Sequence, residues 1–298
     1  MTSNSVMIDR RRTLKGIAAS GAGLAVAART QVARAAQATP VSQATPVTQI
    51  DDDTIFNFVL NLEYLEAEYY LLGTTGTGVG AEDLGANPGT VTGGSQVPFQ
   101  TDAFRQFAEE LAGNELAHVR YYREELGAKA VDRPTLDFTA GFAAVAQGAG
   151  LGADFDPFSG EISFFLGGML FEDVGVTGYK GATPLIKDKE RLEDIAGVLG
   201  VEAYHMGMAR SHLFEAGQAA ISAANAITVA RGKLNGKPEI EQGIEVNGHA
   251  NFVPSDDNGV AFSRTPQEVL QIAYVTPNTG VSSGGFFPDG FNGELKTT

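Results

Sequence analysis

Two pairs of a glutamate and a histidine three residues apart are the residues of this chain best suited to chemistry. They are Glu115 with His118 and Glu202 with His205. Residues i and i+3 are neighbours on one face of a helix, so both members of each pair can reach the same ion. Each pair also continues the apolar stripe of its segment, which predicts that both pairs face a protein core.

Two further segments place a glutamate in their apolar stripe. The stripe of residues 159–179 leads to Glu172, and that of residues 51–72 leads to Glu63 and Glu66. Both glutamates of the first segment face roughly inward, so periodicity alone does not choose between them. Each of the four main predicted helices therefore directs at least one carboxylate toward the core.

Carboxylates in an apolar core need cationic compensation, because an unpaired buried charge costs several kcal/mol or takes up a proton. Four carboxylates carry a charge of −4 and two neutral imidazoles none, so two divalent metal ions balance the set. A single Glu-x-x-His is usually a surface pair, but two copies in the order Glu, Glu-x-x-His, Glu, Glu-x-x-His match the dimetal template of ferritin-like bundles. The predicted ligands are Glu63, Glu115, His118, Glu172, Glu202 and His205. Iron and manganese both suit these oxygen and nitrogen ligands.

The segments that carry these residues predict an all-α fold. We expect long helices near 51–72, 101–126 and 159–179, and a fourth from about 187 that continues past Ala216 and bends near Gly217. They form a ferritin-like four-helix bundle over residues 51–233, in which the long 128–157 connection crosses between helices two and three. Short helices are expected near 139–147 and after Thr265, with little strand. Residues 234–298 form an irregular extension that packs on the bundle.

The first 35 residues are typical of an export signal. Arg10-Arg11-Arg12 precedes a weakly apolar run, and Ala33-Arg34-Ala35 supplies a cleavage site before Ala36. The pattern resembles a twin-arginine signal, with an ordinary secretory signal as the alternative. A Pro- and Thr-rich linker follows at 36–50. We therefore expect a periplasmic or extracellular protein.

Composition excludes several classes of function. The chain has no cysteine, so disulfides, thiolate metal sites and cysteine nucleophiles are ruled out. Residues 1–35 hold six basic residues and one acidic residue, and without them the formal net charge changes from −15 to −20. Such a charge disfavours nucleic acid as a partner. No apolar run is long enough to span a membrane. The sequence is compatible with a homo-oligomer.

Other ionisable residues have weaker claims to a role. Four glutamates lie off the stripe and are expected to be solvated: Glu109, Glu110, Glu124 and Glu125. His212 fits a surface or hydrogen-bonded role, and His249 receives none. Tyr70 and Tyr179 each follow a candidate glutamate by seven residues. Such a tyrosine could orient a ligand or carry redox equivalents, but we favour a core role. No catalytic residue beyond the metal ligands and no organic cofactor is expected.

Several stretches resemble the desiccation-related family of ferritin-like proteins. They are residues 60–70, 115–119, 171–177 and 201–205, together with 264–270 and 285–290 of the tail. The resemblance covers about residues 50–292 and implies the bundle and the six-ligand site. Asn61-Leu62-Glu63 followed by Tyr70 resembles the first helix of ferritins, which favours Glu63 over Glu66. Glu66 is then an outer residue or an extra ligand.

Two kinds of function follow from these expectations. The first is a redox-active dimetal protein that consumes hydrogen peroxide or dioxygen, or oxidises iron, because such a site can leave metal positions open. The second is non-enzymatic: a stress-protection or structural envelope protein that binds metal to stabilise its fold or to sequester it.

Overall fold

The computed structural model describes residues 50–298, which form seven α-helices and two small pairs of strands. The predicted export signal and residues 36–49 of the predicted linker lie outside this part. The helices are α1 (Asp52–Thr75), α2 (Asp102–Leu126), α3 (Phe138–Ala149), α4 (Glu161–Ala182), α5 (Lys189–Glu215), α6 (Gln218–Asn235) and α7 (Pro266–Ala273). The strands have two residues each and pair as β1 (Val91–Thr92) with β2 (Leu136–Asp137), in parallel, and β3 (Glu245–Val246) with β4 (His249–Ala250), antiparallel.

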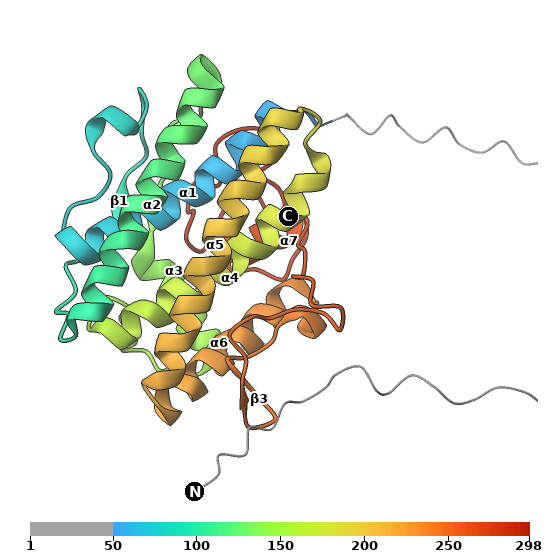
Figure 1. The fold of residues 1–298 in the computed structure, drawn as a ribbon. Helices are drawn as coiled ribbons and strands as arrows, with labels where there is room; N and C mark the ends of the chain where they lie inside the picture. Colours follow the sequence, from blue (N-terminus) through green and yellow to red (C-terminus); the bar gives the residue numbers. More distant parts are fainter. Residues whose placement is uncertain (1–49) are drawn as a thin grey trace, which may run out of the picture. The chain divides into compact units, whose positions relative to one another are not determined.

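Helices α1, α2, α4 and α5 form a four-helix bundle, which confirms the predicted fold class. Helix α1 packs along α2, α4 packs along α5, and the two pairs meet mainly through α1 and α4 (Figure 1). The connection from Leu126 to Glu161 is the long crossover, and it carries α3. Within residues 50–298, no helix combines the length and apolar character that a membrane crossing requires.

The two central helices are buried on every side. Residues 61–70 of α1 and 164–179 of α4 are all buried, whereas α2 and α5 alternate between buried and exposed positions. Helices α6 and α7 pack against α4, and α3 packs against α6, so a second layer covers the face of α4 that a bare bundle would expose to water. A polar side chain in the middle of α1 or α4 is therefore removed from solvent and needs a partner.

The fourth bundle helix is shorter than predicted. The sequence pattern indicated one helix continuing past Ala216 with a bend near Gly217, but α5 ends at Glu215 and a separate helix, α6, begins at Gln218. Gly217 adopts a φ of 93°, a left-handed conformation that glycine reaches without the cost of a Cβ. The break lets α6 leave the bundle direction and join the outer layer.

A buried ionic cluster fixes the C-terminal segment to α4. Asp173 accepts hydrogen bonds from Arg210, at 2.8 and 2.7 Å, and from Arg231, at 2.8 Å. Glu241 joins Arg231 to Arg264. Burial alone would raise the pKa of Asp173, but Arg210 and Arg231 hold it down to about 2. Arg210 also donates to three backbone carbonyls of the segment, those of Gln242, Gly243 and Asn251.

Replacement of Asp173 by asparagine should destabilise the fold. Arg210 and Arg231 would remain buried without their shared carboxylate, and loss of one partner of a buried ion pair typically costs about 3–5 kcal/mol of unfolding free energy. Chemical denaturation followed by circular dichroism measures this loss. The Arg105→Ala variant removes an exposed ion pair with Glu109 and should behave as wild type. Equal stability of the two variants would contradict a stabilising role for the cluster.

Candidate metal centre

The six predicted ligand residues converge in the middle of the bundle. Their candidate ligand atoms form two groups, and within each group the atoms lie within 4.8 Å of one another. The first group is Glu63, Glu115, His118 and Glu202, and the second is Glu115, Glu172, Glu202 and His205. Glu115 and Glu202 belong to both groups, so the two groups adjoin each other in the core.

Each bundle helix supplies its residues from its middle turns. Helix α1 carries Glu63 and α4 carries Glu172, while α2 and α5 each carry a Glu-x-x-His pair. All four glutamates have an exposed fraction of 0%, and the histidines are buried as well. The apolar periodicity that identified these positions in the sequence therefore reports their burial correctly.

Both histidines turn Nδ1 toward the carboxylates. The Nδ1 atom of His118 lies 3.1 Å from Oε2 of Glu63 and 3.1 Å from Oε2 of Glu115. The Nδ1 atom of His205 lies 2.9 Å from Oε1 of Glu115, and its Nε2 lies 3.0 Å from the amide nitrogen of Asn114. Nδ1 is thus the candidate ligand atom of each ring. A ring bound through Nδ1 carries its proton on Nε2, and Asn114 accepts that proton when its side-chain amide is turned so that the oxygen faces Nε2.

Several polar atoms in this cluster have no hydrogen-bond partner. They are Oε2 of Glu172 and both carboxylate oxygens of Glu202. Oε1 of Glu115 and Nδ1 of His205 lie 2.9 Å apart but are not aligned for a hydrogen bond. A buried polar atom without a partner costs free energy and calls for an explanation in a native structure. Carboxylate oxygens and imidazole nitrogens are the ligands that divalent iron and manganese accept. The residues present therefore fit a metal site.

Protons are the cations that compete for this cluster when no metal is bound. Burial raises the pKa of Glu63 to about 7 and raises those of Glu172 and Glu202 as well. Burial alone would lower the pKa of the two imidazoles, but the carboxylates around them raise it, to about 11 for His118 and about 10 for His205. The metal-free cluster accordingly retains protons at neutral pH.

Two buried tyrosines hydrogen-bond to Glu63 and Glu172, and each tyrosine contacts the glutamate of the opposite helix. Tyr70 of α1 donates a 2.6 Å hydrogen bond to Oε1 of Glu172 on α4, and Tyr179 of α4 donates one to Oε1 of Glu63 on α1. The sequence favoured a core role for both tyrosines. Their rings are buried as expected, and their hydroxyl groups also position the two carboxylates, which is the alternative role that the sequence left open.

Glu66, which the sequence left open, lies outside both ligand groups. It is buried, burial raises its pKa well above the usual range, and its Oε2 has no hydrogen-bond partner. The neighbouring Glu68 is also buried, but Arg133 and the backbone N–H of Val79 satisfy it. Glu66 is therefore an unsatisfied acid beside the cluster.

The remaining candidates from the sequence lie away from the site. The four off-stripe glutamates, Glu109, Glu110, Glu124 and Glu125, are exposed. His249 is exposed in β4. The His212 ring packs against three phenylalanines, with ring centroids 4.6 Å from Phe104, 5.3 Å from Phe107 and 5.8 Å from Phe165. Asn114 was missed, because a half-buried asparagine beside Glu115 carries no distinctive spacing.

The fold and the cluster agree with comparisons to known proteins. Residues 51–215 match the family described as ferritin-like domain, and the chain belongs to this family. It is 32% identical to a desiccation-related protein of Craterostigma plantagineum, over 74% of this chain and 76% of that protein. It is 30% identical to a ferritin-like catalase of Nesocodon mauritianus, over 82% of this chain and 84% of that protein. No solved structure matches the chain significantly.

Metal binding at this cluster should weaken as the pH falls. The raised pKa values of Glu63, His118 and His205 mean that ions must displace protons, so lowering the pH from about 8 to about 5.5 favours the protonated cluster. Calorimetric titration with Mn(II) in two buffers of different ionisation enthalpy measures the affinity and the protons released. An affinity independent of pH, with no proton release and an intact circular dichroism spectrum, would contradict this expectation.

Proposed function

We propose that this chain binds two iron or manganese ions in the bundle core and uses them to consume hydrogen peroxide. The observation that carries the proposal is the pair of overlapping ligand groups, fully buried and sharing Glu115 and Glu202. One ion would lie between these two glutamates, Glu63 and His118, and the other between them, Glu172 and His205. Charge balance supports two ions, because two divalent cations neutralise four carboxylates.

The protein contributes mainly by holding the ligands in place and excluding water. The hydroxyl groups of Tyr70 and Tyr179 fix the carboxylates of Glu172 and Glu63, and Asn114 fixes the His205 ring. When bound, a pair of redox-active ions supplies two-electron chemistry. Preorganised ligands keep the reacting geometry without the cost of rearranging during the reaction.

Peroxide is the substrate that the family relationship supports best. One relative is a ferritin-like catalase, aligned over most of both chains. Catalase chemistry converts two hydrogen peroxide molecules to two waters and one dioxygen. One peroxide loses two electrons and two protons, and the other accepts them, so no external reductant or partner protein is needed.

Metal content and peroxide turnover test the proposal together. Wild-type protein loaded with Fe(II) or Mn(II) should hold two ions per chain by elemental analysis and should release dioxygen from hydrogen peroxide. The Glu115→Gln variant removes one of the two shared carboxylates and should lose both most of its metal and at least about 100-fold in turnover. Glu110→Gln, on the exposed side of the same helix, is the matched control and should retain both. Metal-loaded wild type that leaves peroxide unchanged would exclude the catalase activity.

A non-enzymatic role is the second candidate, supported by the desiccation-related relative. Ligands from four different helices couple metal binding to folding, so bound metal would strengthen the bundle under stress. Chelation would then lower the melting temperature substantially. The same metal-loaded preparation distinguishes the two candidates, because only the enzyme also releases dioxygen from peroxide.

We also propose export by the twin-arginine route, on the basis of Arg10-Arg11-Arg12 and the Ala33-Arg34-Ala35 cleavage site. Replacing Arg11 and Arg12 with lysine should retain the full-length chain inside the cell, because this export route recognises the arginine pair. Fractionation and N-terminal sequencing of the wild-type protein should find Ala36 as the first residue of the exported form. Normal export of the double variant would indicate an ordinary secretory signal.

A further inference from the structure

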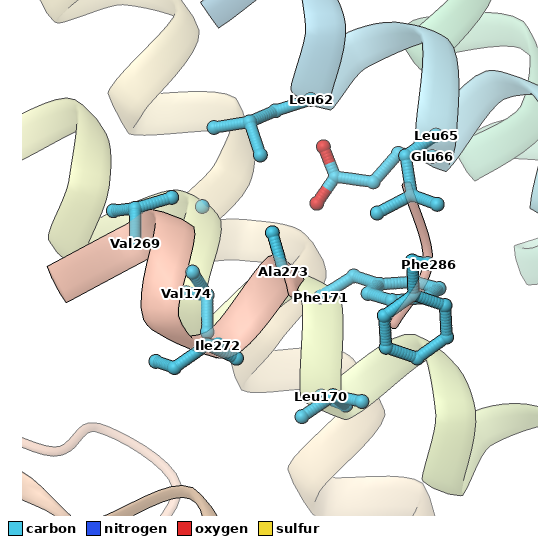
Figure 2. Close-up of a pocket in the computed structure, with 11 residues that line it drawn as sticks. Leu62, Leu65, Glu66, Leu170, Phe171, Val174, Val269, Ile272, Ala273 and Phe286 are labelled. Carbon is cyan, nitrogen blue, oxygen red and sulfur yellow. The ribbon is translucent and has the colours of Figure 1, made fainter. Parts of the chain in front are cut away.

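A small pocket lies next to the candidate metal centre, on the side where α7 covers the bundle. It lies between α1, α4, α7 and the Phe286 ring of the tail, and all its lining residues are buried. Its lining is apolar except for Glu66, whose carboxylate points into it, with the Ala273 methyl group directed toward that carboxylate (Figure 2). The pocket therefore combines apolar walls with one acid.

Gly175 is the point at which this pocket meets the metal centre. It lines the pocket on α4, and a Cβ atom at this position would lie only 2.1 Å from Oε2 of Glu202 and 3.5 Å from Oε1 of Glu66. The absence of a side chain thus allows the Glu202 carboxylate to lie against the α4 backbone. A candidate ligand, Glu202, therefore lies directly against the Gly175 backbone that lines the pocket.

The pocket and the histidines lie on different sides of the centre. No residue of α2 or α5 lines the pocket, whereas both histidines come from these helices. On the histidine side, Asn114 already engages Nε2 of His205. On the pocket side, Oε2 of Glu66 and both oxygens of Glu202 have no hydrogen-bond partner. These carboxylate oxygens can therefore hydrogen-bond to a molecule in the pocket.

We propose that this pocket binds the small neutral substrate beside the metal pair, with Glu66 as its hydrogen-bonding partner. The inference rests on the proposed peroxide function and identifies how that substrate is held. A cavity volume of about 20 Å³ admits a molecule of one or two heavy atoms, such as hydrogen peroxide, and excludes larger substrates. Apolar walls disfavour ions, and a buried acid without a partner favours a molecule that can hydrogen-bond with it.

Larger pockets elsewhere do not compete for this role. The pocket formed by α3 and the segment around Asp156 has a cavity volume of about 390 Å³, and the one between α3 and α6 has about 260 Å³. Neither is lined by any of the six candidate ligands or by Glu66. The pocket between α3 and α6 includes Ala144, which provides a matched control position.

Filling the pocket with a larger side chain tests whether small molecules occupy it when they approach the metal pair. Ala273→Leu places extra methylene groups in front of Glu66, and Ala144→Leu adds the same groups to the pocket between α3 and α6. Nitric oxide is a suitable probe, because it is neutral and small, and its binding to Fe(II)-loaded protein is followed by absorbance. Ala273→Leu should slow its binding about tenfold, because the added methylene groups occupy the pocket, while Ala144→Leu should not. Ala273→Val makes the same test with a smaller change if the leucine variant does not fold.

Replacing Glu66 distinguishes the effect of its hydrogen bond on substrate binding from the effect of pocket volume. Glu66→Leu should raise KM for hydrogen peroxide about tenfold, with a smaller effect on kcat, because the bound molecule loses its polar partner. Glu66→Gln, which keeps hydrogen-bonding atoms of similar shape, should restore KM close to the wild-type value. Both variants should retain wild-type metal content, since Glu66 lies outside the ligand groups, and both should bind nitric oxide at the wild-type rate.

The outcomes distinguish failure of the pocket from failure of the proposed function. If wild-type protein consumes peroxide but Ala273→Leu and Ala144→Leu bind nitric oxide equally fast, the pocket proposal is overturned and the peroxide function stands. If Ala273→Leu alone slows nitric oxide but wild type does not consume peroxide, the peroxide function is overturned and the pocket remains the access site for small neutral molecules. Loss of metal in Glu66→Gln would show that Glu66 is a ligand and would overturn its assignment to the substrate.

Discussion

The close packing of four fully buried carboxylates is the constraint on which the rest of this structure depends. Glu63, Glu115, Glu172 and Glu202 meet in one small region of the core, where water cannot solvate their charge. Such a group of like charges persists only if protons or metal ions compensate it. The two histidines turn Nδ1 toward the carboxylates, so their protonated rings compensate part of this charge when no metal is bound. The types of candidate ligand, their total charge and the two residues that the two ligand groups share all favour our proposal of two divalent ions.

The segments outside the four main helices complete the environment of the site. Helix α7 and the Phe286 region cover the side of α1 and α4 where Glu66 lies, and the cluster around Asp173 fastens the preceding segment to α4. Asp173 follows Glu172 directly, so the helix that presents a candidate ligand is also the helix that anchors the tail. We infer that the C-terminal extension shields the centre from water and shapes the small pocket beside it. The extension is thus part of the site.

The sequence predicted the features that depend on local periodicity. Apolar stripes located the first three main helices and the start of the fourth to within a few residues, and the same stripes identified six ionisable residues that the structure brings together. Features that depend on contacts between distant residues were not predictable in this way. The bonds that Asp173 makes with Arg210 and Arg231 join segments whose spacing in the sequence carries no signal. The seven-residue spacing of Tyr70 and Tyr179 singled out both tyrosines, but it did not indicate that each hydroxyl contacts the glutamate of the other helix. The end of α5 was missed, because a single glycine is compatible with either a bend or a break.

Anomalous scattering from crystals grown with Mn(II) would test the central claim most directly, because it locates the ions rather than inferring them from activity. We predict two peaks per chain, each within about 2.0–2.2 Å of a histidine Nδ1 and of carboxylate oxygens, with Glu115 and Glu202 contacting both ions. A single surface peak, or an empty core with the six side chains in their described positions, would contradict the account.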